Sequence, residues 1–122
     1  MTNEEILAMR AGRELNILVA KEVMERGVAD DETFGFMEKD TNGVYGPLQP
    51  YSEDIAAAWL IVEKLRELNP RVEFDSYSRK WEATFSVQEA DFTCPVVMAD
   101  GAPEAICKAA LLALQEVRRD CE

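Results

Sequence analysis

The sequence contains no histidine, and this absence excludes a large set of catalytic and metal-binding arrangements. Ser-His-Asp and Cys-His nucleophile pairs, HExxH zinc sites and imidazole proton relays all need that side chain. Cysteine is scarce as well: Cys94, Cys107 and Cys121 match no CxxC pair or zinc knuckle. We therefore expect reduced thiols, no bound metal, no cofactor and no enzymatic activity.

Basic residues are also few compared with acidic ones. Thirteen Lys and Arg stand against 24 Asp and Glu, which gives a net charge of −11. Binding to DNA, RNA or an anionic membrane relies on basic surfaces, so we expect neither nucleic acid nor membrane as a partner. No apolar run approaches the ~20 residues that span a bilayer, and the acidic start of the chain is unlike a signal peptide. These features predict a soluble, intracellular protein.

The 122 residues and 48% hydrophobic content fit one globular domain over 1–122. Thr2 and Glu5 form a capping box for a short opening helical turn. Apolar residues then recur at helical spacing in three segments and alternate in two others, the first of which turns at Asn42-Gly43. The predicted order is helix, hairpin, helix, hairpin, helix, over residues 13–26, 33–48, 52–68, 72–87 and 103–119. The fold class expected is α+β: a helix–sheet sandwich, with an antiparallel sheet of two hairpins covered by three helices.

Two details of the helices bear on the core. Ser52 is expected to cap the second long helix, with Glu53 and Asp54 in its first turn. Leu18 and Trp59 each lie on the apolar stripe of their helix, so we expect both in a shared core between helices and sheet. Arg118 and Arg119 suit the negative end of the last helix.

Three stretches of the chain are familiar in combination. They are Ala11-Gly12-Arg13-Glu14-Leu15 with the helix after it, Pro50-Tyr51-Ser52-x-Asp54-Ile55 with Trp59, and Ala102-Pro103-x-Ala105-Ile106-Cys107. In that order and at those separations they resemble the phage ABA sandwich domain, a family of small phage and prophage proteins. The resemblance implies a helix–sheet sandwich and a phage context, hence the cytoplasm of a bacterial host cell. It implies no catalytic residues.

One segment resembles half of a metal site. Glu38-x-Asp40-x-Asn42-Gly43 places oxygen ligands as a calcium loop does, but position twelve is Gln49 rather than a bidentate Glu. A plain Asn-Gly hairpin explains the same residues. The run Asp30-Asp31-Glu32 is interpreted as a solvated acidic loop, because a magnesium site needs carboxylates from separate elements.

The clearest departure from the overall charge is the window 64–81, where five cations face three carboxylates, a net charge of +2. It offers cations beside aromatic rings, which suit a phosphate-bearing base. The candidate ligand-binding residues are Arg71, Tyr77, Arg79, Lys80 and Trp81. A hairpin tip kept soluble by its charge is the alternative, and if Trp81 faces the core, only the cations belong to the site.

Three functions are compatible with these observations. The first is a phage accessory, counter-defence protein that sequesters a small nucleotide immune signal without turning it over, as a homo-oligomer with pockets between subunits. The second is an acidic antagonist that covers a nucleic-acid-binding channel on a host defence protein. The third, an enzyme with paired carboxylates, has no support from residue spacing.

Overall fold

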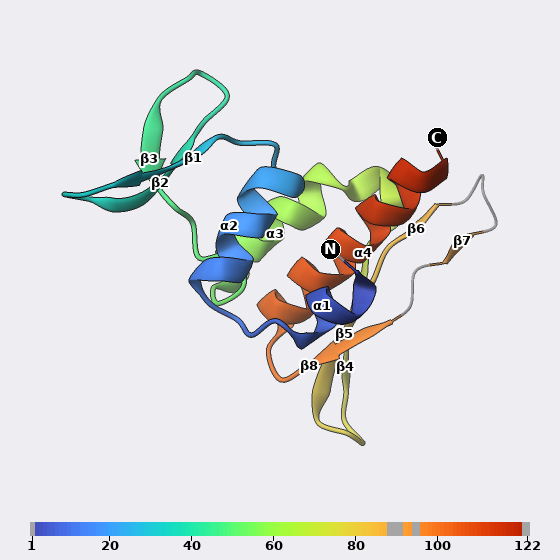
Figure 1. The fold of residues 1–122 in the computed structure, drawn as a ribbon. Coiled ribbons are helices and arrows are strands. Elements are labelled where there is room, and N and C mark those ends of the chain that lie inside the picture. The colour runs from blue at the N-terminus through green and yellow to red at the C-terminus, as the bar shows by residue number, and fades with distance from the viewer. Residues whose placement is uncertain (1, 88–91, 94–95, 121–122) are drawn as a thin grey trace.

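The longest helix, α4 (Ala102–Asp120), runs through the centre of the computed structural model, which describes residues 2–87, 92–93 and 96–120 (Figure 1). One side of α4 packs on strands of an antiparallel sheet and another side packs on helix α3 (Ile55–Lys64). Its small and apolar side chains allow this close approach from both sides. Those that are buried include Ala105, Ile106, Cys107, Ala109, Ala110, Leu111, Leu112 and Ala113.

The other helices lie around α4. Helix α1 (Asn3–Ala8) begins where Thr2 Oγ1 accepts a hydrogen bond from the Glu5 N–H at 3.1 Å, as the capping box predicts. Helix α2 (Arg13–Glu22) follows a short loop and also contacts α4. Helix α3 ends at Lys64 and continues as the 3-10 turn η1 (Arg66–Leu68), which Asn69 closes in a left-handed conformation.

The sheet against α4 has the order β4-β5-β8, formed by β4 (Arg71–Asp75), β5 (Lys80–Thr84) and β8 (Val97–Ala99). The antiparallel register pairs Val72 with Ala83 and Phe74 with Trp81, and Ala83 with Val97. Because side chains alternate between faces, these residues share the inner face that meets α4. Ala83 and Val97 are buried there, whereas Val72 and Trp81 pack against the edge of the core.

A second three-stranded sheet projects from the body as an arm, made of β1 (Val28–Asp31), β2 (Gly35–Lys39) and β3 (Tyr45–Pro47) in the order β1-β2-β3 (Figure 1). The turn between β2 and β3 is the expected Asn-Gly turn, with Gly43 at φ +83°. Its Asp40 carboxylate accepts the N–H groups of Asn42 and Val44, both at 2.9 Å. A further short pair joins β6 (Ser86–Val87) to β7 (Phe92–Thr93).

The α+β class and the helix–sheet sandwich are confirmed. Both expected hairpins form, but they lie in two separate sheets, each completed by a strand that the alternation pattern did not reveal. The added strands are β1 and β8. Both are short, and three of the four residues of β1 are exposed, so neither shows a clear alternation of apolar and polar residues.

Two expectations about helix α3 are wrong. Trp59 is 52% exposed rather than core, because the buried side of α3 is formed by Ala57, Ala58 and Ile61. Leu18 does pack, partly buried, against the core. The helix cap is Asp54, whose carboxylate accepts the Ala56 N–H at 2.9 Å. Ser52 is instead buried before the helix begins.

Of the three cysteines, Cys107 is the one that lies within the described residues. Cys107 is a free, buried thiol in α4, and its pKa is raised above the ordinary value by burial and, less strongly, by the nearby Glu104 carboxylate. Cys94 and Cys121 lie outside the described residues, as do the side chains of Arg118 and Arg119.

Candidate functional site

The turn between β4 and β5 is shaped by one carboxylate. Asp75 accepts hydrogen bonds from the Tyr77 N–H and the Ser78 hydroxyl, both at 3.0 Å. Its backbone carbonyl accepts the Arg79 N–H at 2.8 Å. The bonds to the carboxylate, from Tyr77 first and then from Ser78, lower the pKa of Asp75, so the carboxylate holds the turn in its charged form.

Three of the five predicted site residues meet at this turn: Tyr77, Arg79 and Lys80, which we call the tip. The Tyr77 side chain is 99% exposed. Arg79 has a backbone φ of +59°, a conformation that L-residues other than Asn and Asp seldom adopt. Within the described part of the chain, neither Arg79 nor Lys80 forms an ion pair. The tip therefore presents two free cations beside an open aromatic face.

The remaining two predicted site residues lie apart from the tip. Arg71 pairs in register with Thr84, at the far end of the hairpin, and its guanidinium contacts Glu73 at 3.9 Å. Trp81 is on the inner face, where its ring centroid is 5.2 Å from that of Phe74. Trp81 thus serves packing, which was the stated alternative for this residue, and the candidate site reduces to the tip.

The outer face of the same sheet carries a shallow groove of about 170 Å³, and Arg71 is its only cation. Glu73 and Glu82 face each other across the strands and also line the groove. With two carboxylates to one guanidinium, this groove does not suit an anion.

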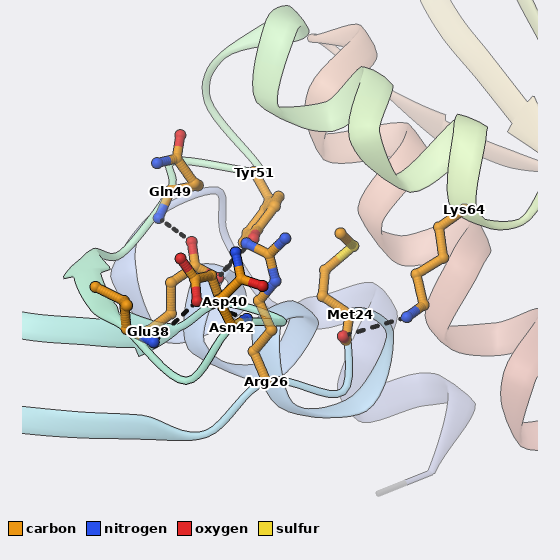
Figure 2. A network of polar contacts seen from close by, with 9 residues as sticks. Met24, Arg26, Glu38, Asp40, Asn42, Gln49, Tyr51 and Lys64 are labelled. Atoms are coloured by element: carbon orange, nitrogen blue, oxygen red, sulfur yellow. Dashed lines mark hydrogen bonds and ion pairs between the residues drawn. The ribbon is translucent and has the colours of Figure 1, made fainter.

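A buried polar network joins the arm to the body (Figure 2). Glu38 is 3% exposed, and one of its carboxylate oxygens accepts the Tyr51 hydroxyl at 2.7 Å and lies 3.4 Å from Arg26. The other oxygen accepts the Gln49 N–H at 2.9 Å. Burial, and then the adjacent Glu38, raise the pKa of Tyr51 above the usual 10.0. Every partner is satisfied, so the network anchors the arm rather than offering a reactive group.

The same network explains the residues that resemble a calcium loop. Glu38 points into the body toward Tyr51, whereas the Asp40 carboxylate caps the β2–β3 turn. The two carboxylates thus do not converge. No group of three or more Cys, Asp or Glu side chains suited to a metal ion occurs among the described residues. The sequence pattern showed the spacing but not which way each side chain turns.

The three stretches that carry the family resemblance meet at one end of the helices. Ser52 Oγ accepts the Gly12 N–H at 2.9 Å and contacts Asn16. Glu104, from the third stretch, accepts the Ala11 N–H at 3.0 Å. These contacts join segments about 40 and 90 residues apart, so the three stretches lie together in the fold.

Comparison with known proteins agrees with this fold. The model of the phage ABA sandwich domain matches residues 17–111, and the chain belongs to that family. A crystal structure of a phage protein from Bacillus cereus ATCC 14579 is similar, with 29% identity, a TM-score of 0.70, and coverage of 89% of this chain and 90% of that one. No match was found among the curated proteins. In the described residues no helix is both long and apolar enough to cross a membrane.

Proposed function

We propose that this phage protein is an accessory factor that acts in the host cytoplasm by binding, without catalysis, and that its ligand is a small phosphate-bearing nucleotide signal of host defence. The observation that carries the proposal is the tip, where Tyr77 is 99% exposed and Arg79 and Lys80, which follow it in the same turn, form no ion pair within the described part of the chain. Phosphate groups would bond to Arg79 and Lys80, and a base would stack on Tyr77.

The backbone of Arg79 adds support. A turn residue at φ +59° is most often Gly or Asn, and an Arg there carries a conformational cost of roughly 1 kcal/mol. Strained residues in native proteins gather at sites of function. Arg79 therefore lies in the exposed turn of the hairpin, where a ligand can reach its side chain.

The test is calorimetric titration with cyclic nucleotides and ADP-ribose-type nucleotides, followed by mass spectrometry of the ligand. Arg79→Ala should weaken binding about tenfold or more, since a charge-assisted contact is worth roughly 1.5–3 kcal/mol. Arg66→Ala removes an exposed cation away from the tip and is the matched control. Binding that is insensitive to Arg79, or cleavage of the ligand, would contradict the proposal.

A second candidate function is the acidic antagonist of a host protein that binds nucleic acid. The observation that favours it is the net charge of −11. Three of the acidic residues, Asp30, Asp31 and Glu32, are exposed on the projecting arm. If no nucleotide in the panel binds, and Asp30→Asn with Asp31→Asn weakens capture of a basic host protein, this function replaces the first.

A further inference from the structure

The groove on the outer face of the β4-β5-β8 sheet contains a carboxylate that the fold does not use. Glu82 is half-buried on the central strand, between Glu73 on β4 and Met98 on β8. In the described part of the chain its carboxylate forms no ion pair and no hydrogen bond, whereas Glu73 lies 3.9 Å from the Arg71 guanidinium. Like charges directly opposite each other destabilise a sheet, so Glu82 does not stabilise the fold at this position. Its oxygens are available to a ligand.

The groove combines this acceptor with a donor and with apolar surface. Its volume of about 170 Å³ is lined by Glu82, by Arg71 and by Val96, which is 54% exposed. Arg71 and Glu82 are diagonal neighbours on adjacent strands, which places them roughly 7–8 Å apart. The Arg71 side chain is 74% exposed, so it can turn toward the groove. An internal cavity of roughly 150 Å³ holds one benzene ring, so this open groove has room for one planar ring system.

The groove also adjoins the tip. Lys80 and Glu82 are two residues apart on β5, so their side chains leave the same face about 7 Å apart along the strand. Along the hairpin the chain therefore places an aromatic ring at Tyr77, then two cations at Arg79 and Lys80, and then an acceptor at Glu82. A dinucleotide presents a matching order, because its phosphates lie between its two bases.

We propose that the groove binds the second base of a dinucleotide ligand, that this base is guanine, and that Glu82 selects it. The inference rests on the proposed function, in which Arg79 and Lys80 hold the phosphates and the first base stacks on Tyr77. Guanine carries two adjacent N–H donors, at N1 and N2, which match the two oxygens of one carboxylate. Its O6 atom, next to N1, accepts a hydrogen bond from the Arg71 guanidinium.

The other bases complement this carboxylate less well. Adenine and cytosine each present one amino group beside an unprotonated ring nitrogen, whose lone pair repels the second carboxylate oxygen. Uracil and thymine present a single N–H between two carbonyl oxygens. Because a carboxylate can only accept hydrogen bonds, Glu82 gains two of them from guanine and at most one from another base. A hydrogen bond to a charged group changes affinity about tenfold or more, so one carboxylate suffices for selection.

Calorimetric titration with a matched series of cyclic dinucleotides tests the proposal. Cyclic di-GMP should bind about tenfold or more tightly than cyclic di-AMP, and cyclic di-IMP, which lacks the N2 amino group, should fall between them. Glu82→Gln should weaken cyclic di-GMP binding about tenfold or more but should not weaken cyclic di-AMP binding, because a glutamine amide pairs with adenine. Glu63→Gln changes an exposed carboxylate on α3 and should keep the wild-type preference.

The wild-type series decides the proposal even if Glu82→Gln misfolds. Equal affinity for the three dinucleotides, a preference for adenine, or a guanine preference that survives in folded Glu82→Gln would overturn it. Arg79→Ala separates this inference from the proposed function. If all three bind equally and Arg79→Ala weakens each of them, the tip binds the ligand and the groove does not. A guanine preference that Glu82→Gln removes, with no effect of Arg79→Ala, gives the reverse result, and binding of none contradicts both.

Discussion

The hydroxyl oxygen of Ser52 lies 2.6 Å from Oδ1 of Asn16, and this contact joins the segment just before helix α3 to helix α2. Asn16 Oδ1 also accepts the Ser52 N–H at 2.8 Å, and Ser52 Oγ accepts the Gly12 N–H at 2.9 Å. Both side chains are buried, at 3% and 5% exposure. One hydroxyl thus satisfies groups that the first turn of α2 would otherwise leave without a partner.

Ser52→Ala should lower the free energy of unfolding by about 1–3 kcal/mol, because the partly buried Gly12 N–H loses its acceptor and the side-chain oxygen of Asn16 keeps only the Ser52 N–H as a donor. Urea melts monitored by circular dichroism measure this loss. Ser76→Ala changes an exposed serine in the β4–β5 turn and should stay within about 0.5 kcal/mol of wild type. Equal effects of the two changes would contradict the assigned role of Ser52.

Trp59→Ala should cost less than about 1 kcal/mol of unfolding free energy, because half of the side chain is already exposed. Ile61→Ala, two positions along the same helix, removes a fully buried side chain and should cost about 2–5 kcal/mol. Urea melts at low protein concentration measure both. A loss of 3 kcal/mol for Trp59→Ala would show that this side chain is buried in the core.

The stability of the protein should fall as the pH rises above about 10, through Tyr51. Its pKa in the folded state lies above the usual 10.0, so in that range the unfolded chain releases a proton that the folded chain retains. Its contribution is fully present below pH 10 and is lost as the pH rises toward the folded pKa.

Urea melts on both sides of pH 10 should show that Tyr51→Phe removes part of this dependence. Tyr77→Phe changes a tyrosine that is 99% exposed and should leave the slope as in wild type. At neutral pH Tyr51→Phe should also cost about 1–3 kcal/mol, because Glu38 loses a buried donor. A slope unaltered by Tyr51→Phe would exclude this residue as its source.

Arg79→Gly should separate folding from binding. Glycine adopts φ +59° without steric cost, so thermal stability should be unchanged or higher, by at most about 1 kcal/mol. Ligand affinity should fall as it does for Arg79→Ala, because both lack the guanidinium. Scanning calorimetry and the nucleotide titration measure the two effects. A variant that is destabilised by more than 1 kcal/mol would show that the Arg79 side chain supports the turn itself.

Much of the secondary structure of this protein is determined by interactions between residues that are close in sequence. The Thr2–Glu5 capping box, the Asn42-Gly43 turn and the alternation along 72–87 each depend on neighbours within a few residues. The sequence therefore predicted the helices, both hairpins and the α+β class. The tip was also predictable, because Tyr77, Arg79 and Lys80 are adjacent in one turn.

Contacts between distant segments were decided only by the tertiary structure. Residues 55–62 are apolar throughout, so no periodicity could show which side of α3 meets α4, and Trp59 was assigned to the wrong side. Glu38 and Ser52 are common turn and cap residues, yet Glu38 pairs with Tyr51 and Ser52 with Asn16. A side chain's direction depends on what packs against it, and those partners are brought near only when the whole chain has folded.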